Sequence, residues 1–313
     1  MSEFGVLNEE LARASASVQS LVTVHTMATF GIAQGGEGIH DELVRCLVRG
    51  DKIAAFALTE PGAGSDASAV ATVAVKSGDG YVLNGEKCWV TYGQLADVYL
   101  VIAKVAGASA AFVVPRACDG VIVGPSPPLS ALRASMQAHI RLVDVVVPAK
   151  SLVGRVGLGV SHIAGSALMH GRYCVAWASV GIAQLALEAS ANHATARLQA
   201  ATRLSDHQLV RRLLTEAYAD VETARLMCER AGRAHDTADP RAADDTLLAK
   251  YVASRAAVRV AEAARQILGA RGFIEGSDVE RCCRDARALE VVEGPTEVLQ
   301  DLIGARVAGK YAH

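Results

Sequence analysis

The sequence predicts an α+β fold in which a small β domain interrupts an otherwise helical protein. Apolar residues recur three and four positions apart near the start, Val- and Ile-rich segments separated by Gly, Pro or Asp follow, and the second half has long stretches nearly free of proline. We therefore expect a partial N-terminal helical domain over 1–52, a β-barrel domain over 53–150 and a C-terminal helical bundle over 151–313.

Helical spacing marks both ends of the chain. In the first part, "LNEELARASASVQSLVTVH" and "IHDELVRCLVRG" follow the period of an amphipathic helix, and Gly50 ends the second segment. Residues 160–235 and 241–310 return to this pattern, and Pro240 is the only proline between Pro148 and Pro295. Long helices without internal breakers predict a bundle.

The middle of the chain has short β-type segments. "AVATVAVKSGDGYVLNG" predicts two strands around a Ser-Gly-Asp-Gly turn, and "VYLVIAKV", "AAFVVP", "GVIVG" and "IRLVDVVVP" follow at short spacing. Such spacing predicts a small all-β barrel or sandwich. A β domain thus interrupts a helical protein, and clefts between domains are where ligands usually bind.

Composition limits the function classes. The 313 residues are 51% hydrophobic, and a net charge of −2 gives no global field for nucleic acid or an anionic membrane. Seven cysteines form no disulfide or metal pattern, which predicts reduced thiols and a cytoplasmic location. No signal peptide is visible, and the uncharged run 173–187 is short for a bilayer span and predicts a core helix.

Two segments of the β domain are candidate binding motifs. In "LTEPGAGSDAS", 58–68, two glycines free the backbone for close approach to a ligand, and the Ser65 hydroxyl could hold phosphate or flavin oxygens, although an ordinary turn fits equally. In "NGEKCWVTYG", 84–93, strand alternation places Trp89 and Thr91 on one face. They could wall a planar cofactor, and core packing is the alternative.

Two further segments lie in the helical second half. "RQILGARGF", 265–273, predicts a helix that ends at Gly269 or Gly272. "ALEVVEGPTEVLQ", 288–300, places Glu293 between two valines and a Gly-Pro pair that breaks regular structure. A lone surface carboxylate is the simplest interpretation of Glu293.

In order along the chain, "LTEPGAGSD", "LNGEKCWVT" and "ERCCRDARALEVVEGPTEVLQ" resemble the acyl-CoA dehydrogenase family of flavoenzymes. The resemblance runs from about residue 6 to the C-terminus. "GRYCVAWASVGI", 171–182, and "SDHQLV", 205–210, look most like the acyl-carrier-protein dehydrogenases of hydroxymalonyl and methoxymalonyl polyketide extender-unit pathways. The resemblance implies an acyl-CoA dehydrogenase-like fold and FAD as the cofactor.

The resemblance also implies a reaction in which a carboxylate removes the α-proton of a thioester while the flavin accepts a hydride. Glu293 matches the catalytic base. We expect Val291 and Val292 to desolvate it and raise its pKa. Gly294 would let the backbone turn so that neighbouring N–H groups face the substrate carbonyl.

Other site residues follow from the resemblance alone. Arg172 matches an arginine near the substrate, with a helix-surface salt bridge as the alternative. The implied FAD-binding residues are Thr59, Ser65, Trp89 and Thr91 in the β domain, Arg197 and Gln208, which in the family reach the FAD of a neighbouring subunit, and Gln266 and Gly269 in the loop over the adenosine part.

Three departures from the family pattern bear on this interpretation. Helices that usually precede the present start help to wall the acyl pocket in the family, which predicts a more open site, a partner or a truncated start. Ala200 and Ala201 replace an aromatic residue and a glycine, so a contact with the neighbouring FAD is lost. Pro295 replaces a hydroxyl residue and removes a donor, for which Thr296 could compensate.

The sequence thus predicts an FAD-dependent dehydrogenase of a small acyl thioester, carried by an acyl carrier protein, in a secondary-metabolite pathway. A generic short-chain acyl-CoA dehydrogenase and a catalytically impaired homologue with a structural or binding role are the alternatives. We expect a homodimer or homotetramer, no nucleic acid or membrane partner, and an electron acceptor that the sequence leaves open. The candidate basic residues for carrier docking are Arg133, Arg141, Arg211 and Arg212.

Overall fold

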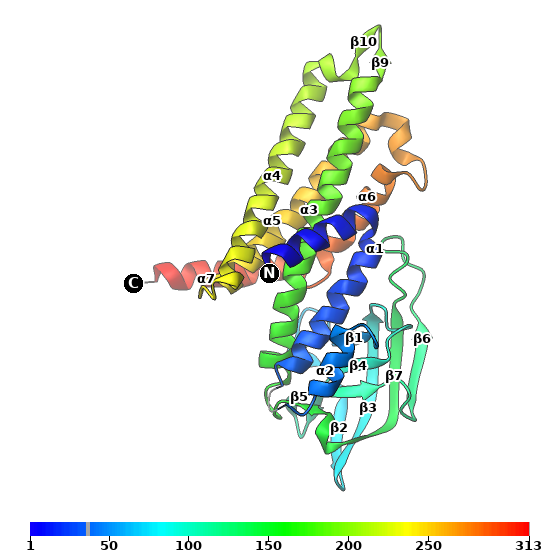
Figure 1. Ribbon diagram of the computed structural model, residues 1–313, viewed down its shortest axis with the longest axis vertical. Coiled ribbons are helices and arrows are strands. Elements are labelled where there is room, and N and C mark those ends of the chain that lie inside the picture. The colour runs from blue at the N-terminus through cyan, green and yellow to red at the C-terminus, as the bar shows by residue number, and fades with distance from the viewer. Residues whose placement is uncertain (36–37, 313) are drawn as a thin grey trace. The chain divides into compact units, whose positions relative to one another are not determined.

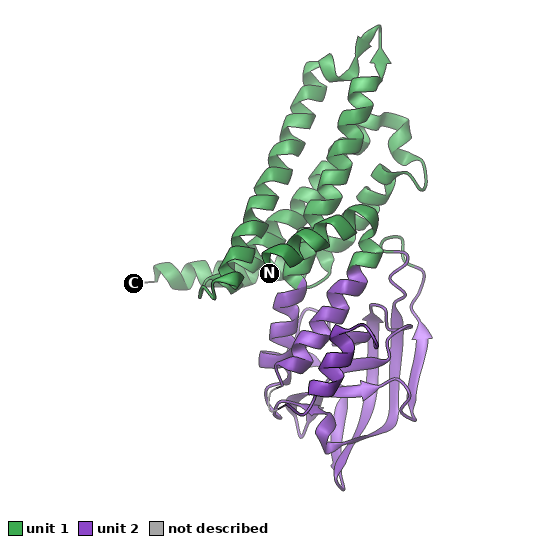
Figure 2. Cartoon of the chain, in the orientation of Figure 1, with its two compact units in different colours: residues 1–19, 129–132, 172–313 green, residues 20–128, 133–171 purple. Residues whose placement is uncertain are grey.

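A computed structural model describes residues 1–35 and 38–312. The chain forms two compact units (Figure 2). The helical unit comprises residues 1–19, 129–132 and 172–313, and the sheet unit comprises residues 20–128 and 133–171. Helical N- and C-terminal parts around a middle sheet domain confirm the predicted α+β class.

The sheet unit is built on eight strands (Figure 1). Their order is β6-β7-β3-β2-β4-β5-β8, with β1 parallel to β4. The predicted turn between β2 and β3 is present, because Ser77 pairs with Gly80. The bounds are β1 Ala54–Ala57, β2 Val73–Ser77, β3 Gly80–Val90, β4 Val98–Val105, β5 Ala108–Pro115, β6 Val121–Pro125, β7 Ala138–Pro148 and β8 Leu152–Val153.

Apolar side chains bury one face of this sheet, and at β4 and β5 they bury both faces. One cluster includes Leu83, Tyr99, Phe112 and Ile140. In a second cluster, Leu100 and Ile102 of β4 pack with residues of α1, Ser2–Ala33, and α2, Asp41–Val48. This double burial explains the nearly continuous apolar sequence of β4, since each alternate residue faces a core.

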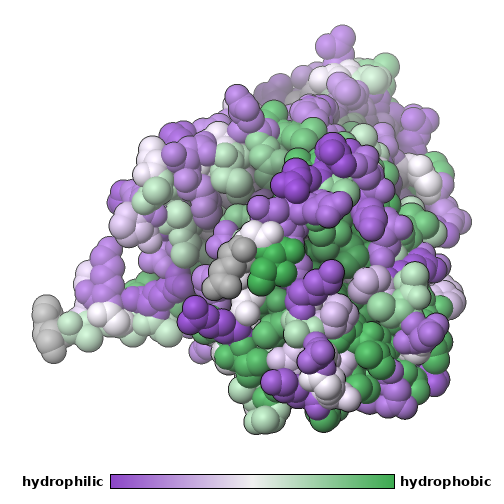
Figure 3. Space-filling view, turned by 60° about the horizontal axis from the view of Figure 1, so that its bottom comes forward, coloured by the Kyte–Doolittle hydropathy of each residue, from purple (hydrophilic) through white to green (hydrophobic). Residues whose placement is uncertain are grey.

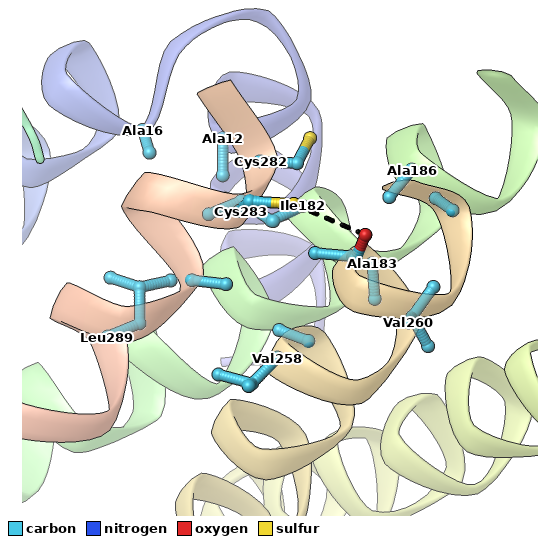
Figure 4. Close-up of a cluster of buried hydrophobic side chains, with 14 of the residues drawn as sticks. Ala12, Ala16, Ile182, Ala183, Ala186, Val258, Val260, Cys282, Cys283 and Leu289 are labelled. Atoms are coloured by element: carbon cyan, nitrogen blue, oxygen red, sulfur yellow. Dashed lines mark hydrogen bonds between the residues drawn. The ribbon is translucent and has the colours of Figure 1, made fainter. Parts of the chain in front are cut away.

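Long helices form the helical unit. They are the start of α1, most of α3 Gly165–Ala196, α4 Gln208–Asp236, α5 Ala242–Leu268, α6 Asp278–Val291 and α7 Thr296–Tyr311. Alanine dominates their contacts, and small residues allow close helix packing. Figure 4 shows this core, in which the Cys283 thiol of α6 donates to the Ala261 carbonyl of α5 at 3.3 Å.

One helical stretch, 159–196, is long and apolar enough to cross a membrane by length and composition. However, 72% of its most apolar window is buried inside the protein, as expected for a core helix. This stretch begins with a π-helical turn over Gly159–Ala164 and continues as α3. It contains the uncharged run that the sequence assigned to the core.

The helical prediction for 160–235 is wrong between α3 and α4. A short hairpin, β9 Leu198–Gln199 and β10 Thr202–Arg203, interrupts the helices. Its two turn residues, Ala200 and Ala201, have φ of 50° and 63°. Two left-handed residues make the tight turn that hairpins prefer, but alanine carries none of the Gly or Asn signal that marks such turns in a sequence.

Candidate functional site

Glu293 lies in the break between α6 and α7. α6 ends at Val291 and α7 begins at Thr296, and the residues between them reverse the chain. Glu293 has a φ of 57° and Gly294 a φ of 102°, so both adopt backbone conformations that side chains disfavour. Such strain in a residue that is not glycine is concentrated at functional sites. The Gly-Pro break after Glu293 is therefore a specific turn rather than a loose loop.

Two cationic side chains from other helices hold this turn. Arg172 of α3 donates from Nε to the Glu293 carbonyl oxygen at 2.9 Å. Lys250 of α5 donates from Nζ to the Gly294 carbonyl at 2.8 Å and to the Glu290 carbonyl at 3.1 Å. The structure therefore brings together Arg172, Glu293 and Gly294, as the sequence interpretation requires, and adds Lys250, which that interpretation missed.

The Glu293 carboxyl group has an unusual environment. Its Oε2 is buried and has no hydrogen-bond partner among the described residues. Burial raises the pKa of Glu293 to about 7, against the opposing charges of Arg172 and Lys250. A carboxyl group with a pKa near the working pH is a competent general base, because it is both ionised and basic enough to take a proton.

The predicted cause of this burial needs a correction. Val291 is 61% exposed, so it does not desolvate the Glu293 carboxyl group as expected. The last turn of α6 directs Val291 to the surface, whereas Val292 packs against the helical core. Arg172 is partly buried and binds the Glu293 carbonyl, which places it in the site.

Pro295 and Thr296 start the next helix. Pro295 is the N-cap of α7 and offers no side-chain cap, and a proline has no N–H to donate. The Thr296 hydroxyl is buried without a hydrogen-bond partner among the described residues. An unsatisfied buried hydroxyl is unfavourable unless a ligand pairs with it. The expectation that Thr296 replaces the donor lost at 295 stays a prediction.

In the sheet unit, a buried ion pair joins the two candidate motifs. The Glu60 carboxylate accepts from Lys87 Nζ at 2.6 Å, from the Thr72 hydroxyl at 2.6 Å and from the Thr72 amide at 3.1 Å. Lys87 also donates to the Leu58 carbonyl at 3.0 Å. Burial disfavours the charge, but these hydrogen bonds and that of the Ala71 amide hold the pKa of Glu60 below its usual range.

Sequence reasoning missed this pair. Glu60 lies in the 58–68 motif and Lys87 in the 84–93 motif, but the ligand-binding features predicted for these motifs are their glycines, Ser65 and Trp89. Burial lowers the pKa of Lys87 to about 8, and Glu60 opposes this change. The pair anchors the loop after β1 to β3, so it fixes the backbone from which the candidate flavin-binding side chains extend.

The candidate flavin-binding side chains lie at the end of β3, Trp89 and Thr91, and in the loop after β1, Thr59 and Ser65. The Cys88 amide donates to the Thr59 carbonyl at 2.9 Å, which places half-buried Thr59 next to Trp89 in the backbone pairing. Ser65 is exposed in the glycine-containing loop. Thr91 is not on a strand face, because β3 ends at Val90 and Trp89 has a φ of 57° that breaks the alternation. The predicted strand geometry of this pair is therefore wrong.

Trp89 is not a core residue. Hydrophobic side chains are scattered among hydrophilic ones on the surface that Figure 3 shows, as is normal for proteins. Trp89, however, is 46% exposed and meets His139 edge-on with ring centroids 5.3 Å apart. The His139 Nε2 atom is buried without a partner among the described residues. An exposed indole beside an unpaired donor or acceptor fits a planar, polar ligand such as a flavin.

The remaining predicted cofactor residues are exposed in the helical unit. Arg197 follows α3 at the base of the hairpin, where its carbonyl accepts from the Leu204 amide at 2.9 Å, and Gln208 is the first residue of α4. Gln266 is in the last turn of α5, and Gly269 ends that helix with a φ of 59°. Their exposure leaves them accessible to a ligand or a second subunit.

Comparison with known proteins gives consistent results along nearly the whole chain. Residues 55–145 match the acyl-CoA dehydrogenase middle domain, and residues 159–308 match the acyl-CoA dehydrogenase C-terminal domain. The human mitochondrial short-chain specific acyl-CoA dehydrogenase is 33% identical over 98% of this chain and 76% of its own.

Two solved structures have the same fold. The first is FkbI, for biosynthesis of the methoxymalonyl extender unit of the Fk520 polyketide, which is 31% identical with a TM-score of 0.91 over 98% of this chain and 84% of its own. The second is a glutaryl-CoA dehydrogenase from Mycobacterium smegmatis in complex with FADH2, which is 28% identical with a TM-score of 0.92 over 99% of this chain and 80% of its own.

Proposed function

Since this chain belongs to the acyl-CoA dehydrogenase family of FAD-dependent oxidoreductases, we propose that Glu293 is the base that removes the α-proton of a small acyl thioester. The observation that supports this most directly is the buried Glu293 carboxyl group with its unpaired Oε2. A base needs such a free oxygen for the incoming proton.

The environment of Glu293 favours proton transfer in the forward direction. When the carboxylate takes the α-proton it becomes neutral, which is the form that burial favours. Arg172 and Lys250 oppose this effect and keep the carboxyl group partly ionised at neutral pH. The hydride acceptor for the substrate β-carbon would be supplied by bound FAD.

For the cofactor, Thr59, Ser65, Trp89 and Thr91 are proposed to bind the flavin side of FAD. Arg197, Gln208, Gln266 and Gly269 are proposed to serve FAD in a homodimer or homotetramer. Their exposure in the single chain supports this assignment, since residues that bind across an interface must be accessible before assembly. Light scattering of the FAD-loaded protein at micromolar concentration should give at least a dimer, and a monomer would contradict the shared site.

The thioester is proposed to be carried by an acyl carrier protein, and the similarity to FkbI supports this proposal. Two of the candidate docking arginines are less available than expected, because Arg211 pairs with Asp206 at 3.3 Å and Arg212 with Glu216 at 3.6 Å. CoA is the second candidate, favoured by the similarity to the short-chain acyl-CoA dehydrogenase.

A substrate comparison separates the two carriers. If a carrier protein presents the acyl group, kcat/KM for the acyl-carrier substrate exceeds that for the same acyl group on CoA. It also falls steeply with salt, since exposed charges chiefly set the association rate. Equal kcat/KM for the two thioesters would return the assignment to a generic acyl-CoA dehydrogenase.

Replacement of the base tests the proposed reaction. Glu293→Gln keeps the size and hydrogen bonding of the side chain, so FAD binding should be retained while flavin reduction by substrate slows by about 10²–10⁴-fold. Glu297→Gln, an exposed glutamate in the first turn of α7, is the matched control and should leave the rate unchanged. A Glu293→Gln rate within about tenfold of the unmodified protein would exclude Glu293 as the base.

A further inference from the structure

Lys250 is a buried ionisable group to which the proposed reaction gives no chemical step. Its side chain is 0% exposed, although lysine is among the residues least often buried. It lies in the first half of α5 and sends Nζ to two backbone carbonyls, those of Glu290 and Gly294. Two of the three N–H donors of its ammonium group therefore bind the short segment 290–294.

These two carbonyls flank Glu293 in the chain. The Glu290 carbonyl belongs to the last turn of α6, where carbonyls lack a helical partner, and the Gly294 carbonyl follows the base directly. One ammonium group thus clamps the backbone on both sides of the left-handed Glu293. Arg172 binds the carbonyl of Glu293 itself, so all three held carbonyls depend on buried or partly buried cations.

The charge of Lys250 also acts on the Glu293 carboxyl group. Among the described residues, the charges of Glu293, Arg172, Glu290 and Glu297 act most strongly on Lys250. Glu293, Glu290 and Glu297 stabilise its positive charge, and Arg172 opposes it. Burial has the largest influence and lowers the pKa of Lys250 to about 8. In turn, Lys250 and Arg172 limit the rise in the pKa of Glu293 that burial causes.

We propose that Lys250 is a positioning residue for catalysis, which clamps the carbonyls of Glu290 and Gly294 so that Glu293 keeps its strained backbone conformation. This inference rests on the proposed function of Glu293. Its Nζ is used on the two backbone carbonyls, so Lys250 acts on the reaction through the position of Glu293. Its loss should therefore change kcat far more than KM.

The test replaces Lys250 by Met, which keeps the stem and removes both the donors and the charge. In the FAD-loaded protein we expect kcat to fall by about 10–100-fold with little change in KM, since a small displacement of a catalytic group has this effect. The lost cation should move the acidic limb of the kcat–pH profile upward by about one pH unit. Lys250→Gln, which keeps a neutral donor, should lose less kcat but show the same pH shift.

A second readout does not depend on turnover. In protein labelled with ¹³C at glutamate carboxyl groups, and with the Glu293 signal assigned by its absence in Glu293→Gln, the Glu293 titration should move to higher pH in both Lys250 variants. Ser254→Ala is the matched control. Ser254 is equally buried one turn along α5, and its hydroxyl donates to the Lys250 carbonyl at 2.9 Å, away from the Glu293 turn, so neither readout should change.

The outcomes separate this inference from the base assignment. A Glu293 signal that titrates at the same pH in folded Lys250→Met or Lys250→Gln overturns the positioning role. A Glu293 signal that shifts while the kcat–pH profile stays fixed overturns the assignment of Glu293 as the base. Equal effects of Ser254→Ala and Lys250→Met on kcat would reduce Lys250 to a residue of general packing and contradict the inference.

Discussion

Two glutamates with buried carboxyl oxygens, Glu60 in the sheet unit and Glu293 in the helical unit, show how the same side chain can serve opposite purposes. Each lies near a buried lysine whose pKa burial lowers to about 8. Lys87 binds the Glu60 carboxylate directly, and Thr72 adds two further hydrogen bonds. Lys250 instead binds backbone carbonyls near Glu293, and the Glu293 oxygen Oε2 has no hydrogen-bond partner in the part of the chain that the structure describes.

This difference separates a structural carboxylate from a catalytic one. Hydrogen bonds to the charged form of Glu60 overcome the cost of burial, so its pKa falls. Glu293 has no such hydrogen bonds at Oε2 within the described part of the chain, so burial prevails and its pKa rises to about 7. A lysine that holds the backbone rather than the carboxylate can position a base without neutralising it.

The largest expected effect on stability comes from breaking the structural pair. Lys87→Met leaves the Glu60 carboxylate buried without its counter-charge, and such a loss typically costs about 3–5 kcal/mol of unfolding free energy. Urea denaturation at pH 7 would measure this change. Lys76→Met, at an exposed position of β2, should change the free energy of unfolding by less than about 0.5 kcal/mol. Equal effects of the two substitutions would show that the Glu60–Lys87 pair is not a structural anchor.

The catalytic carboxylate should give the opposite result. The raised pKa of Glu293 means that the folded state holds its proton more tightly than the unfolded state, so its contribution to stability declines as pH rises from about 4.5 through about 7. Glu293→Gln removes this cost, so the free energy of unfolding at pH 8 should rise by about 1–2 kcal/mol. This figure allows for the attraction to the carboxylate that Lys250 and Arg172 lose in the variant.

Urea denaturation at pH 5 and pH 8 would test this prediction. The stabilising effect of Glu293→Gln should be smaller at pH 5, where Glu293 is already neutral in the folded protein. Glu297→Gln should show no such dependence on pH. A Glu293→Gln protein that is less stable at pH 8 would mean that the Glu293 carboxylate is paired, like that of Glu60.

Backbone strain alone does not define the catalytic site, and the hairpin offers a comparison. Ala201 has a φ of 63°, close to that of Glu293, but it is exposed at the tip of the β9–β10 turn. Ala201→Gly should relieve the strain and raise the free energy of unfolding by about 1 kcal/mol, with no effect on the pKa of Glu293. Ala263→Gly within α5 should instead lower the free energy of unfolding by about 1 kcal/mol.

Local pattern was sufficient to predict most of the fold. The helical period predicted α4, α5 and α6, and the Ser-Gly-Asp-Gly turn predicted the β2–β3 hairpin. Two errors have a common origin, because Trp89 and Ala201 adopt left-handed conformations that their residue types do not signal. The backbone at these positions is determined by the surrounding structure and not by local preference.

For the candidate site, the resemblance to the family identified Glu293, Arg172 and Gly294, but not the residues that hold them. Lys250 is 43 residues from Glu293 in the sequence, on a helix where alanine is the most frequent buried residue. Glu60 and Lys87 are 27 residues apart. Pairings over such separations depend on tertiary packing, which neither periodicity nor a short motif records. The cofactor residues stay predictions.

The most direct test is the titration of the two glutamates in the unmodified protein. In protein labelled with ¹³C at glutamate carboxyl groups, the signals absent from Glu60→Gln and Glu293→Gln identify the two residues. Glu293 should titrate with a pKa of about 7, while the pKa of Glu60 should lie below the ordinary value of a glutamate. A Glu293 signal that titrates at or below the ordinary pKa of glutamate would contradict its role as the buried base.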